Sequence, residues 1–371
     1  MKNYIFLFIL FLYSFYFSST IKAQKYFGGD ASMLPTYEKQ GNIYYTEKGK
    51  AMPFLDMVKE SGWNTIRVRL FVEPQYAPQA HQDEGVIQDL AYIIPFCQQI
   101  QDKGMDIMLD FHYSDTWADP GKQFIPKSWL KASKDALADS VYNYTKRSLI
   151  TLKNNGITPK FIQVGNEITF GMLWPAGKVN PLENDNWDYL TQYIRSGSKA
   201  CREICPQSKI IIHTEHAQQL KTTLSYYNHL KEYGVDYDII GLSYYPMWHG
   251  SIPHLRRVLN ALSDQYPDKK IMITETAFYY SHQKDQWAKS ANQYGQYYSI
   301  TPKGQAKFTR KLITMLNKQH NVIGVFWWFP EENESKYPVL KGWINRGLFD
   351  NNNGKALPAF YEFIKYKKSL P

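Results

Sequence analysis

Residues 161–167 read FIQVGNE and residues 271–278 read IMITETAF, and these two stretches decide the fold that the sequence predicts. Each is a short apolar run of the kind that forms a buried strand, and each delivers a glutamate, Glu167 or Glu275, where that run stops. A charge at the end of an apolar strand is costly unless it faces a site. If both strands belong to one parallel barrel, both carboxylates open onto the same face.

Outward from these stretches, the chain repeats a unit of a short apolar strand followed by a helix. We predict eight strands, at residues 26–30, 65–70, 106–112, 161–167, 209–216, 238–245, 271–278 and 322–330. Near-continuous apolar strands are typical of a parallel sheet that is buried on both faces. Eight strand–helix units predict an α/β fold, a single (β/α)8 TIM barrel. The alternative is an open doubly wound sheet, but no Gly-rich phosphate turn follows the first strand.

The N-terminal segment predicts export. Residues 1–23 contain a basic residue, a long apolar run and then small residues up to Ala23, which is the pattern of a cleaved signal peptide. An uncleaved membrane anchor is the alternative, because the apolar run is nearly long enough to span a bilayer. With no linker or low-complexity tract elsewhere, we expect residues 24–371 to form one catalytic domain, located outside the cell, in a periplasm or at the cell surface.

Composition limits the class of partner. The formal net charge is +9, but the basic residues are dispersed rather than clustered, so we expect no nucleic-acid surface. Aromatic residues are abundant, with 29 Tyr, 20 Phe and 10 Trp. Most of them belong to the core, but aromatic rings also form the stacking surfaces of sugar-binding clefts. We expect a monomer whose partner is a polysaccharide.

Two carboxylates on either side of a sugar bond are the machinery of a glycosidase. One must be protonated to release the leaving oxygen, and the other must be ionised to attack the anomeric carbon. Retention of configuration requires the two to lie roughly 5–5.5 Å apart. For either glutamate alone, an ordinary ion pair at a strand end is an equal alternative, but both together favour catalysis.

Other polar and aromatic residues at strand exits suggest supporting roles. Arg69 and Tyr244 are candidates to hold Glu275 ionised. The alternative for Arg69 is an ion pair on the outer face of the barrel, and the alternative for Tyr244 is packing in the core. Asn166 is a candidate to bind the sugar 2-hydroxyl. Trp327 or Trp328 is expected to floor the subsite of the cleaved sugar, and alternation along a strand predicts that only one of them points inward.

The Asn166–Glu167 pair on the fourth strand, with Glu275 on the seventh, resembles the retaining glycosidases that share a (β/α)8 barrel. That resemblance implies Glu167 as general acid/base and Glu275 as nucleophile. Longer stretches are similar to the endo-β-1,4-galactanases of glycoside hydrolase family 53, nearly throughout the mature chain. These stretches are GGDAS (28–32), GWNTIRVRLFVEP (62–74), DFHYSDTWADPGKQ (110–123), VGNEITFGMLWPAGK (164–178), DIIGLSYYPMWHG (238–250) and ITETAF (273–278).

The narrower resemblance implies hydrolysis of β-1,4-galactan side chains of pectic arabinogalactan, by internal cleavage and with retention. It also implies subsite roles for His112, Trp117, Asp119 and Trp328. Some bacterial members carry a calcium-binding loop after the eighth strand. Here residues 331–350 are short and acidic only at their start, without regular calcium-ligand spacing. We therefore expect no cofactor: a bound calcium is an alternative that the short loop after the eighth strand does not support.

Three other functions compete with this hypothesis. A β-1,4-mannanase or cellulase would use the same barrel and the same two glutamates. A non-catalytic polysaccharide-binding protein would keep the aromatic residues but would not need both glutamates. A metallohydrolase would gather Asp110, His112, His213 and His216 at the barrel mouth, although such barrels usually begin with a His-x-His that is lacking in the first strand here.

Overall fold

The computed structural model describes residues 25–282 and 297–366. The expected signal peptide, residues 1–23, therefore lies outside the described residues. Eight parallel strands close into a barrel in the order β1-β10-β9-β8-β7-β4-β3-β2, which confirms the (β/α)8 prediction and excludes the open sheet. The strands are β1 (Tyr26–Asp30), β2 (Thr65–Leu70), β3 (Asp106–Phe111), β4 (Phe161–Val164), β7 (Lys209–Thr214), β8 (Ile239–Tyr244), β9 (Lys270–Thr276) and β10 (Val322–Trp328).

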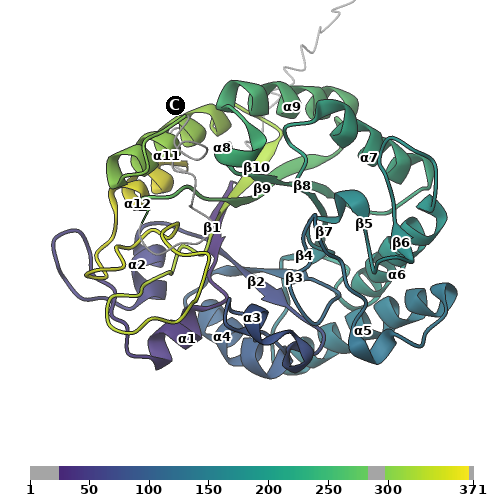
Figure 1. Cartoon of the computed structure of the whole chain (residues 1–371), viewed down its shortest axis with the longest axis horizontal. Helices are drawn as coiled ribbons and strands as arrows, with labels where there is room; N and C mark the ends of the chain where they lie inside the picture. The colour runs from purple at the N-terminus through teal and green to yellow at the C-terminus, as the bar shows by residue number, and fades with distance from the viewer. Residues whose placement is uncertain (1–24, 283–296, 367–371) are drawn as a thin grey trace, which may run out of the picture.

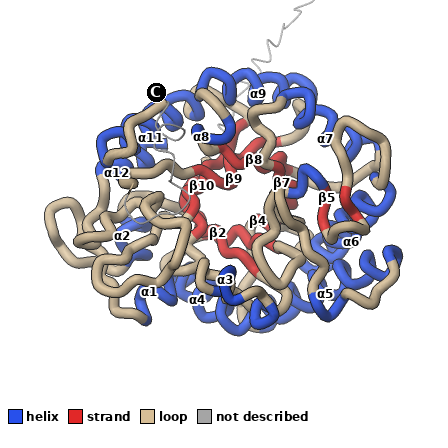
Figure 2. The backbone as a smooth tube through the Cα atoms, in the orientation of Figure 1, coloured by secondary structure: helices blue, strands red, loops and turns tan. Residues whose placement is uncertain are grey.

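Helices surround the central ring of strands (Figures 1 and 2). The longer ones are α4 (Leu90–Asp102), α5 (Lys134–Asn154), α6 (Trp187–Ile204), α7 (Leu220–Glu232), α9 (Ile252–Gln265) and α11 (Pro302–Leu316). The shorter ones are α1 (Leu34–Lys39), α2 (Phe54–Glu60), α3 (Gln79–Gln82), α8 (Pro246–His249) and α12 (Pro358–Phe363). A two-stranded hairpin, β5 (Gly171–Met172) and β6 (Gly177–Lys178), lies in the loop after β4. In the part of the chain that is described, no helix is both long enough and apolar enough to cross a membrane.

Local chemistry explains where the elements begin and end. Helix α5 starts at Lys134 because the Ser133 hydroxyl accepts a hydrogen bond from the Ala136 amide, a typical N-cap. Strand β4 ends at Val164, three residues before the predicted end, because Gly165 turns the chain with φ +85°. The predicted strand 161–167 was therefore too long, and Glu167 lies in the turn that follows it.

Two layers fill the inside of the barrel. The first is a cluster of apolar side chains that is separate from the main core between strands and helices. Its buried members are Met108, Phe161, Ile211, Ile239, Met272, Ile323 and Phe326. The second layer lies toward the carboxyl ends of the strands and is polar, with Arg67, Gln163 and His213 all buried. The polar layer supports the residues at the barrel mouth.

Candidate active site

A cleft of about 530 Å³ opens at the carboxyl ends of the barrel strands. Eight of the ten predicted site residues line it: Arg69, His112, Trp117, Asp119, Asn166, Glu167, Glu275 and Trp328. The other two, Tyr244 and Trp327, do not. Catalytic sites of this fold lie at this face, so the cleft is where chemistry is expected.

The turn after β4 brings Glu167 into the cleft. An added Cβ at Gly165 would lie 2.9 Å from the Ile168 side chain, so the turn is tight as well as left-handed. Glu167 itself has φ 48° and ψ 49°, an unusual conformation for a residue with a side chain. Its Oε1 atom lies 2.5 Å from the Ser243 hydroxyl at the end of β8.

Glu167 lies in surroundings that favour its neutral form. Burial is the main cause that raises its pKa well above the ordinary value, and the negative charges of Glu275 and Glu215 add to the effect. Among the described residues, no lysine or arginine forms an ion pair with it. A carboxyl that stays protonated near neutral pH can act as a general acid.

Glu275, near the end of β9, has the opposite kind of partner. Its Oε1 lies 2.9 Å from Nη2 of Arg67, and its Oε2 accepts a hydrogen bond of 3.0 Å from the Tyr245 hydroxyl. Burial raises the pKa of Glu275, but Arg67 and Tyr245 oppose that rise because both stabilise the ionised form. Of the two glutamates, Glu275 is therefore the one held as a carboxylate.

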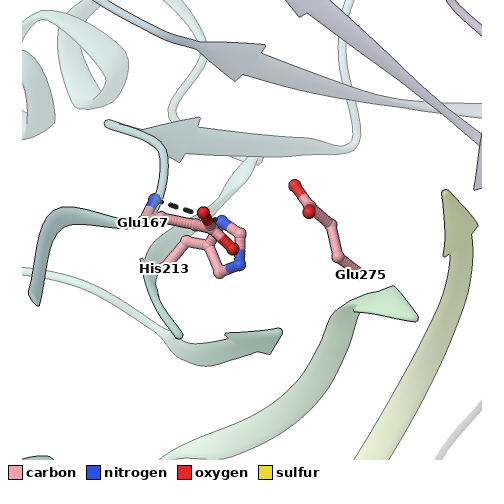
Figure 3. Close-up of side chains that lie close together, drawn as sticks. All are labelled: Glu167, His213 and Glu275. Carbon is pink, nitrogen blue, oxygen red and sulfur yellow. Dashed lines mark hydrogen bonds between the residues drawn. The ribbon is translucent and has the colours of Figure 1, made fainter. Parts of the chain in front are cut away.

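The two carboxylates face each other across a short gap (Figure 3). A carboxylate oxygen of each, together with a ring nitrogen of His213, lies within 4.8 Å of the others. This separation fits a retaining glycosidase, in which the carboxyl groups are about 5–5.5 Å apart, and not the wider spacing of about 6.5–9.5 Å in inverting enzymes.

The expectation that Arg69 holds Glu275 ionised was wrong, because Arg67 does so. Arg69 instead forms an ion pair of 3.0 Å with Asp30 and stacks on Trp117 and Phe329. Both arginines point into the barrel, as their spacing of two residues on β2 requires.

Tyr244 and Trp327 also lie elsewhere than expected. Tyr244 is fully buried, packs on Phe308 of α11 and donates its hydroxyl proton to the Gly250 carbonyl. Alternation along β8 explains this position, because Ser243 and Tyr245 share the inner side and Tyr244 points outward. The same rule separates the two tryptophans: Trp327 is fully buried against Phe308 and Phe363, whereas Trp328 lines the cleft.

Three residues suggested by the resemblance form part of the cleft wall. His112 lies 3.1 Å from Asp110 through Nε2 and accepts the Ala118 amide proton at Nδ1. Trp117 packs against the His112 ring, and Asp119 pairs with Lys122 at the rim. Their positions suit subsite residues, and their contacts with sugar remain a prediction.

Asn166 is held firmly from both ends of its side-chain amide. Its Oδ1 accepts a hydrogen bond of 2.8 Å from Arg67, and its Nδ2 donates one of 2.8 Å to the Ala118 carbonyl. The side chain is 5% exposed and lines the cleft beside Glu167. Its proposed bond to the sugar 2-hydroxyl remains a prediction.

Several cleft residues were not predicted from the sequence. Trp343 and Arg346, in the loop after β10, extend the aromatic wall that Trp328 begins, with the Arg346 guanidinium 4.4 Å from the Trp328 ring and 4.6 Å from the Trp343 ring. The further lining residues outside the predicted set are Asp30, Arg67, His81, Glu84, Ala118, Pro120, Lys122, Glu215, His216, Gln218, Tyr245, Trp248 and His249, of which His216 had been considered only as a metal ligand. Most of the others lie in loops without periodic patterning. Strand alternation could have identified Arg67 and Tyr245, and Asp30, Glu215 and His216 lie at the ends of predicted strands.

The ligand set expected of a metallohydrolase is not assembled. Asp110 bonds to His112, His216 bonds to Glu215, and His213 uses both ring nitrogens within the barrel. Within residues 25–282 and 297–366, the one group with metal-ligand side chains at ligand distance is Glu167, His213 and Glu275. Because both nitrogens of His213 are already hydrogen-bonded, this group fits an acid–base site better than a metal centre.

The acidic start of the loop after β10 is used to hold the loop itself. One oxygen of Glu332 accepts the Arg346 and Gly347 amide protons at 2.9 and 2.8 Å, and the other accepts protons from the Asn345 amide and the Asn351 side chain. Oxygens that receive N–H donors do not point at a cation. The chemistry of this carboxylate therefore does not fit a calcium ligand.

Comparisons with known proteins agree with this geometry. The profile of the family described as "Glycosyl hydrolase family 53" matches residues 26–363. The chain is 33% identical to the arabinogalactan endo-beta-1,4-galactanase of Cellvibrio japonicus (strain Ueda107), over 91% of this chain and 90% of that protein. It is also 33% identical to the endo-beta-1,4-galactanase of Bacillus subtilis (strain 168), over 82% of this chain and 69% of that one.

A solved structure shares the whole barrel. The Ignisphaera aggregans GH53 catalytic domain superposes with a TM-score of 0.81 at 32% identity, covering 91% of this chain and 94% of that one. The match of the family profile covers nearly all of the described residues, including the turn after β4 that carries Glu167 and the strand β9 that carries Glu275. Fold, carboxylate pair and sequence thus lead to one conclusion: this chain belongs to glycosyl hydrolase family 53.

Proposed function

We propose that the protein is a retaining endo-β-1,4-galactanase that cleaves galactan side chains of pectic arabinogalactan. The observation that carries the proposal is the pair of facing carboxylates, within 4.8 Å, of which one is bonded to an arginine and a tyrosine and the other to no cation among the described residues. The names of the relatives from Cellvibrio and Bacillus support galactan as the substrate.

The geometry supports a double displacement. A Glu275 oxygen attacks the anomeric carbon while the bond to the leaving oxygen breaks, and Glu167 gives its proton to that oxygen. A glycosyl ester on Glu275 results. Water then enters, loses a proton to Glu167 and attacks the same carbon, which frees Glu275 and restores the proton on Glu167. Both residues therefore end the cycle as they began it.

The position of the cleft walls supports internal cleavage of a chain. Trp328, Trp343 and Arg346 come from β10 and its loop, and β10 pairs with β9, which carries Glu275. His216 and Gln218 follow β7, next to β4 and Glu167. Lining residues on both sides of the carboxylates suit sugar units on both sides of the cleaved bond. We assign the β10 side to the glycone, because the leaving group must lie toward Glu167.

The test of the substrate is release of reducing ends from linear β-1,4-galactan, β-1,4-mannan and β-1,4-glucan at equal concentration. We expect activity on galactan, with early products several sugars long. Activity confined to mannan or glucan would keep the mechanism and reject the substrate. Binding of galactan without hydrolysis would instead indicate a non-catalytic sugar-binding protein.

A second test addresses the role of Glu167. In a Glu167→Ala variant we expect kcat on galactan to fall by about 10²–10⁴-fold, the usual contribution of general acid–base catalysis. A galactobioside with a dinitrophenyl leaving group needs no proton for departure, so formation of the glycosyl ester on that substrate should be nearly unaffected. Added azide should then yield a β-galactosyl azide. Equal losses on both substrates would contradict the assignment.

We also propose that the protein works as an exported monomer without a metal or organic cofactor. The pattern of residues 1–23 supports export to the cell exterior, a periplasm or the cell surface. The double displacement asks only for two carboxylates, and Glu332 is engaged by N–H donors.

A further inference from the structure

A row of three aromatic residues continues outward from one end of the cleft. His216 lines the cleft, and the Phe170 ring meets the His216 ring edge to face, with the ring centroids 4.9 Å apart. The Phe170 carbonyl accepts a hydrogen bond of 2.9 Å from Nε1 of Trp174. Trp174 is in turn the partner of Phe124 in a short parallel β-bridge. We call Phe170, Trp174 and Phe124 the outer strip.

The outer strip has no role in the core. Phe124 is 51% exposed, and Phe170 and Trp174 are partly exposed. Among the described residues, none of the three belongs to an apolar core cluster or packs against one. Single exposed apolar residues are common on protein surfaces, but neighbouring aromatic residues beside a cleft are typical of a binding surface.

The outer strip lies on the Glu167 side of the cleft. Phe170 ends the short 3-10 turn that directly follows Glu167. Gln123, the residue before Phe124, donates through Nε2 to the carbonyls of Asn166 and Glu167 at 2.9 and 3.3 Å. The hairpin of β5 and β6, which carries Trp174, lies outside the ring of strands beside β4 and β7 (Figure 1). Because the leaving group must lie toward Glu167, the outer strip is on the leaving-group side.

The backbone around Phe124 turns its side chain toward the mouth of the barrel. Lys122 and Phe124 each form a β-bridge, and side chains alternate along such an extended segment. Lys122 lines the cleft, whereas Gln123 is buried against the turn that carries Glu167. Alternation therefore returns Phe124 to the side of Lys122, where it can meet a ligand that leaves the cleft.

The hairpin holds Trp174 in place before any ligand arrives. An added Cβ at Gly171 would lie 1.9 Å from the Gly177 carbonyl oxygen, so the two short strands approach closely. The Trp174 amide donates a hydrogen bond of 2.7 Å to the Gln123 carbonyl, and Nζ of Lys178 lies 4.4 Å from the Trp174 ring centroid. A surface that is already ordered loses less conformational entropy when it binds.

The chemistry of the outer strip fits a sugar chain. One face of a galactose ring carries C–H groups that pack on aromatic rings, and its hydroxyls accept hydrogen bonds from ammonium groups such as those of Lys122 and Lys178. A chain that is cut in its interior continues beyond the leaving oxygen. We propose that the outer strip binds galactose units of the leaving part of the chain, outside the cleft. This inference rests on the proposed function.

The expected effect of this surface is on binding and not on the chemical step. The outer strip does not contact the reacting atoms, so its contribution is made equally in the ground state and in the transition state. Removing it should therefore raise KM for long chains and leave kcat nearly unchanged. Substrates too short to reach the outer strip should not be affected at all.

The experiment is the position of cleavage in galactooctaose that carries a fluorescent tag at its reducing end. The leaving part of the chain carries that end. When binding on the leaving-group side is weakened, the chain is cut with fewer sugars on that side, so the tagged products should be shorter in Phe124→Ala than in the wild type. Phe124→Tyr keeps an aromatic ring and should keep the wild-type products. A general disturbance of the fold would lower the rate without this shift.

Initial rates give a second measure of the same surface. In Phe124→Ala we expect kcat/KM on galactan to fall by about 3–10-fold, the scale of one aromatic contact. The galactobioside with a dinitrophenyl leaving group has no sugar on the leaving side, so its kcat/KM should be unchanged. Ile150→Ala, at an apolar position of α5 that is 38% exposed, is the matched control and should change neither value.

Three results would overturn the proposal. Tagged products of unchanged length in both Phe124→Ala and Trp174→Ala would show that the outer strip does not bind the chain. Longer tagged products would place it on the glycone side. Equal losses on galactan and on the galactobioside would show that the variant disturbs the turn that carries Glu167.

Failure of the proposed function has a different signature. The wild type itself would then not hydrolyse galactan, whatever the residue at position 124. Isothermal titration of galactooctaose into Glu275→Gln, with and without Phe124→Ala, tests the outer strip without turnover. We expect the second substitution to weaken binding by the same factor as it lowers kcat/KM. Equal affinities would contradict the proposal.

Discussion

A Glu275→Gln variant should lose hydrolysis of galactan by more than about 10⁴-fold, the scale on which removal of the nucleophile acts in covalent catalysis. The amide keeps the shape of the side chain and can still bond to Tyr245, but it cannot form the glycosyl ester. We expect the variant to fold and to bind galactan, so the loss should appear in kcat. Initial rates of reducing-end release, with binding by isothermal titration, measure both.

Rescue by a small anion separates this role from any other. Azide can occupy the space left in Glu275→Ala and attack the anomeric carbon of an activated β-galactobioside from the side where Glu275 stood. The product should be an α-galactosyl azide, the opposite configuration to that expected from the Glu167 variant. A Glu203→Gln variant, on the exposed surface of α6, is the matched control and should retain full activity. A β-azide from Glu275→Ala would contradict the assignment of the nucleophile.

An Arg67→Met variant should lose both stability and activity. Arg67 is 1% exposed and bonds to the carboxylates of Asp30, Asp110 and Glu275 at 2.8–2.9 Å. Methionine fills much of the space but leaves three buried acids without their shared cation. Breaking a buried ion pair from one side costs about 3–5 kcal/mol. Urea-induced unfolding at pH 7 measures that loss.

The pH dependence of this variant gives a further check on its cause. Without Arg67, the pKa of Glu275 should rise, so the acid limb of kcat/KM should move to higher pH. Although burial alone would raise the pKa of Asp30, Arg69 and Arg67 hold it below its ordinary value. Their contribution to stability is therefore present above the unfolded-state pKa and lost below about pH 4. The difference in unfolding free energy between wild type and variant should shrink there.

Arg202→Met is the matched control for the loss of an ion pair. Arg202 pairs with Asp236 and Asp238 but is partly exposed, and its side chain is 30% accessible. Solvent screening should limit its effect to about 1 kcal/mol or less. Similar destabilisation by the two arginine variants would show that burial of the charge cluster is not what makes Arg67 important.

The sequence predicted the barrel and both glutamates because each strand carries its own signal. Apolar runs that end in acids are visible without knowledge of the fold, and alternation predicts which neighbours share a face. Alternation does not, however, show which partner each inward-facing side chain reaches inside the barrel. Arg67 and Arg69 share the inner face of β2, and only the closed barrel shows that Arg67 reaches Glu275 while Arg69 is taken by Asp30.

Contacts between residues far apart in the chain could not be predicted from the sequence, because they depend on which strands are neighbours in the barrel and on how irregular loops fold. Ser243 and His213 lie 30 residues apart, and their bond exists because β7 and β8 are neighbours in the barrel. Trp343 and Arg346 lie in an irregular loop, where no periodicity predicts orientation. The inward orientation of Tyr245 could have been predicted, because a strand that places Ser243 inward must also place Tyr245 inward.

The left-handed backbone at Glu167 has a consequence for engineering. A residue with a side chain in that conformation lowers folding stability by on the order of 1 kcal/mol relative to glycine. Stability alone would therefore favour glycine at position 167 over the catalytic glutamate. Glycine there would be expected to raise the melting temperature and to abolish turnover together. A search for thermostable variants that considers folding energy alone would therefore favour replacement of Glu167, and that replacement would remove the catalytic activity.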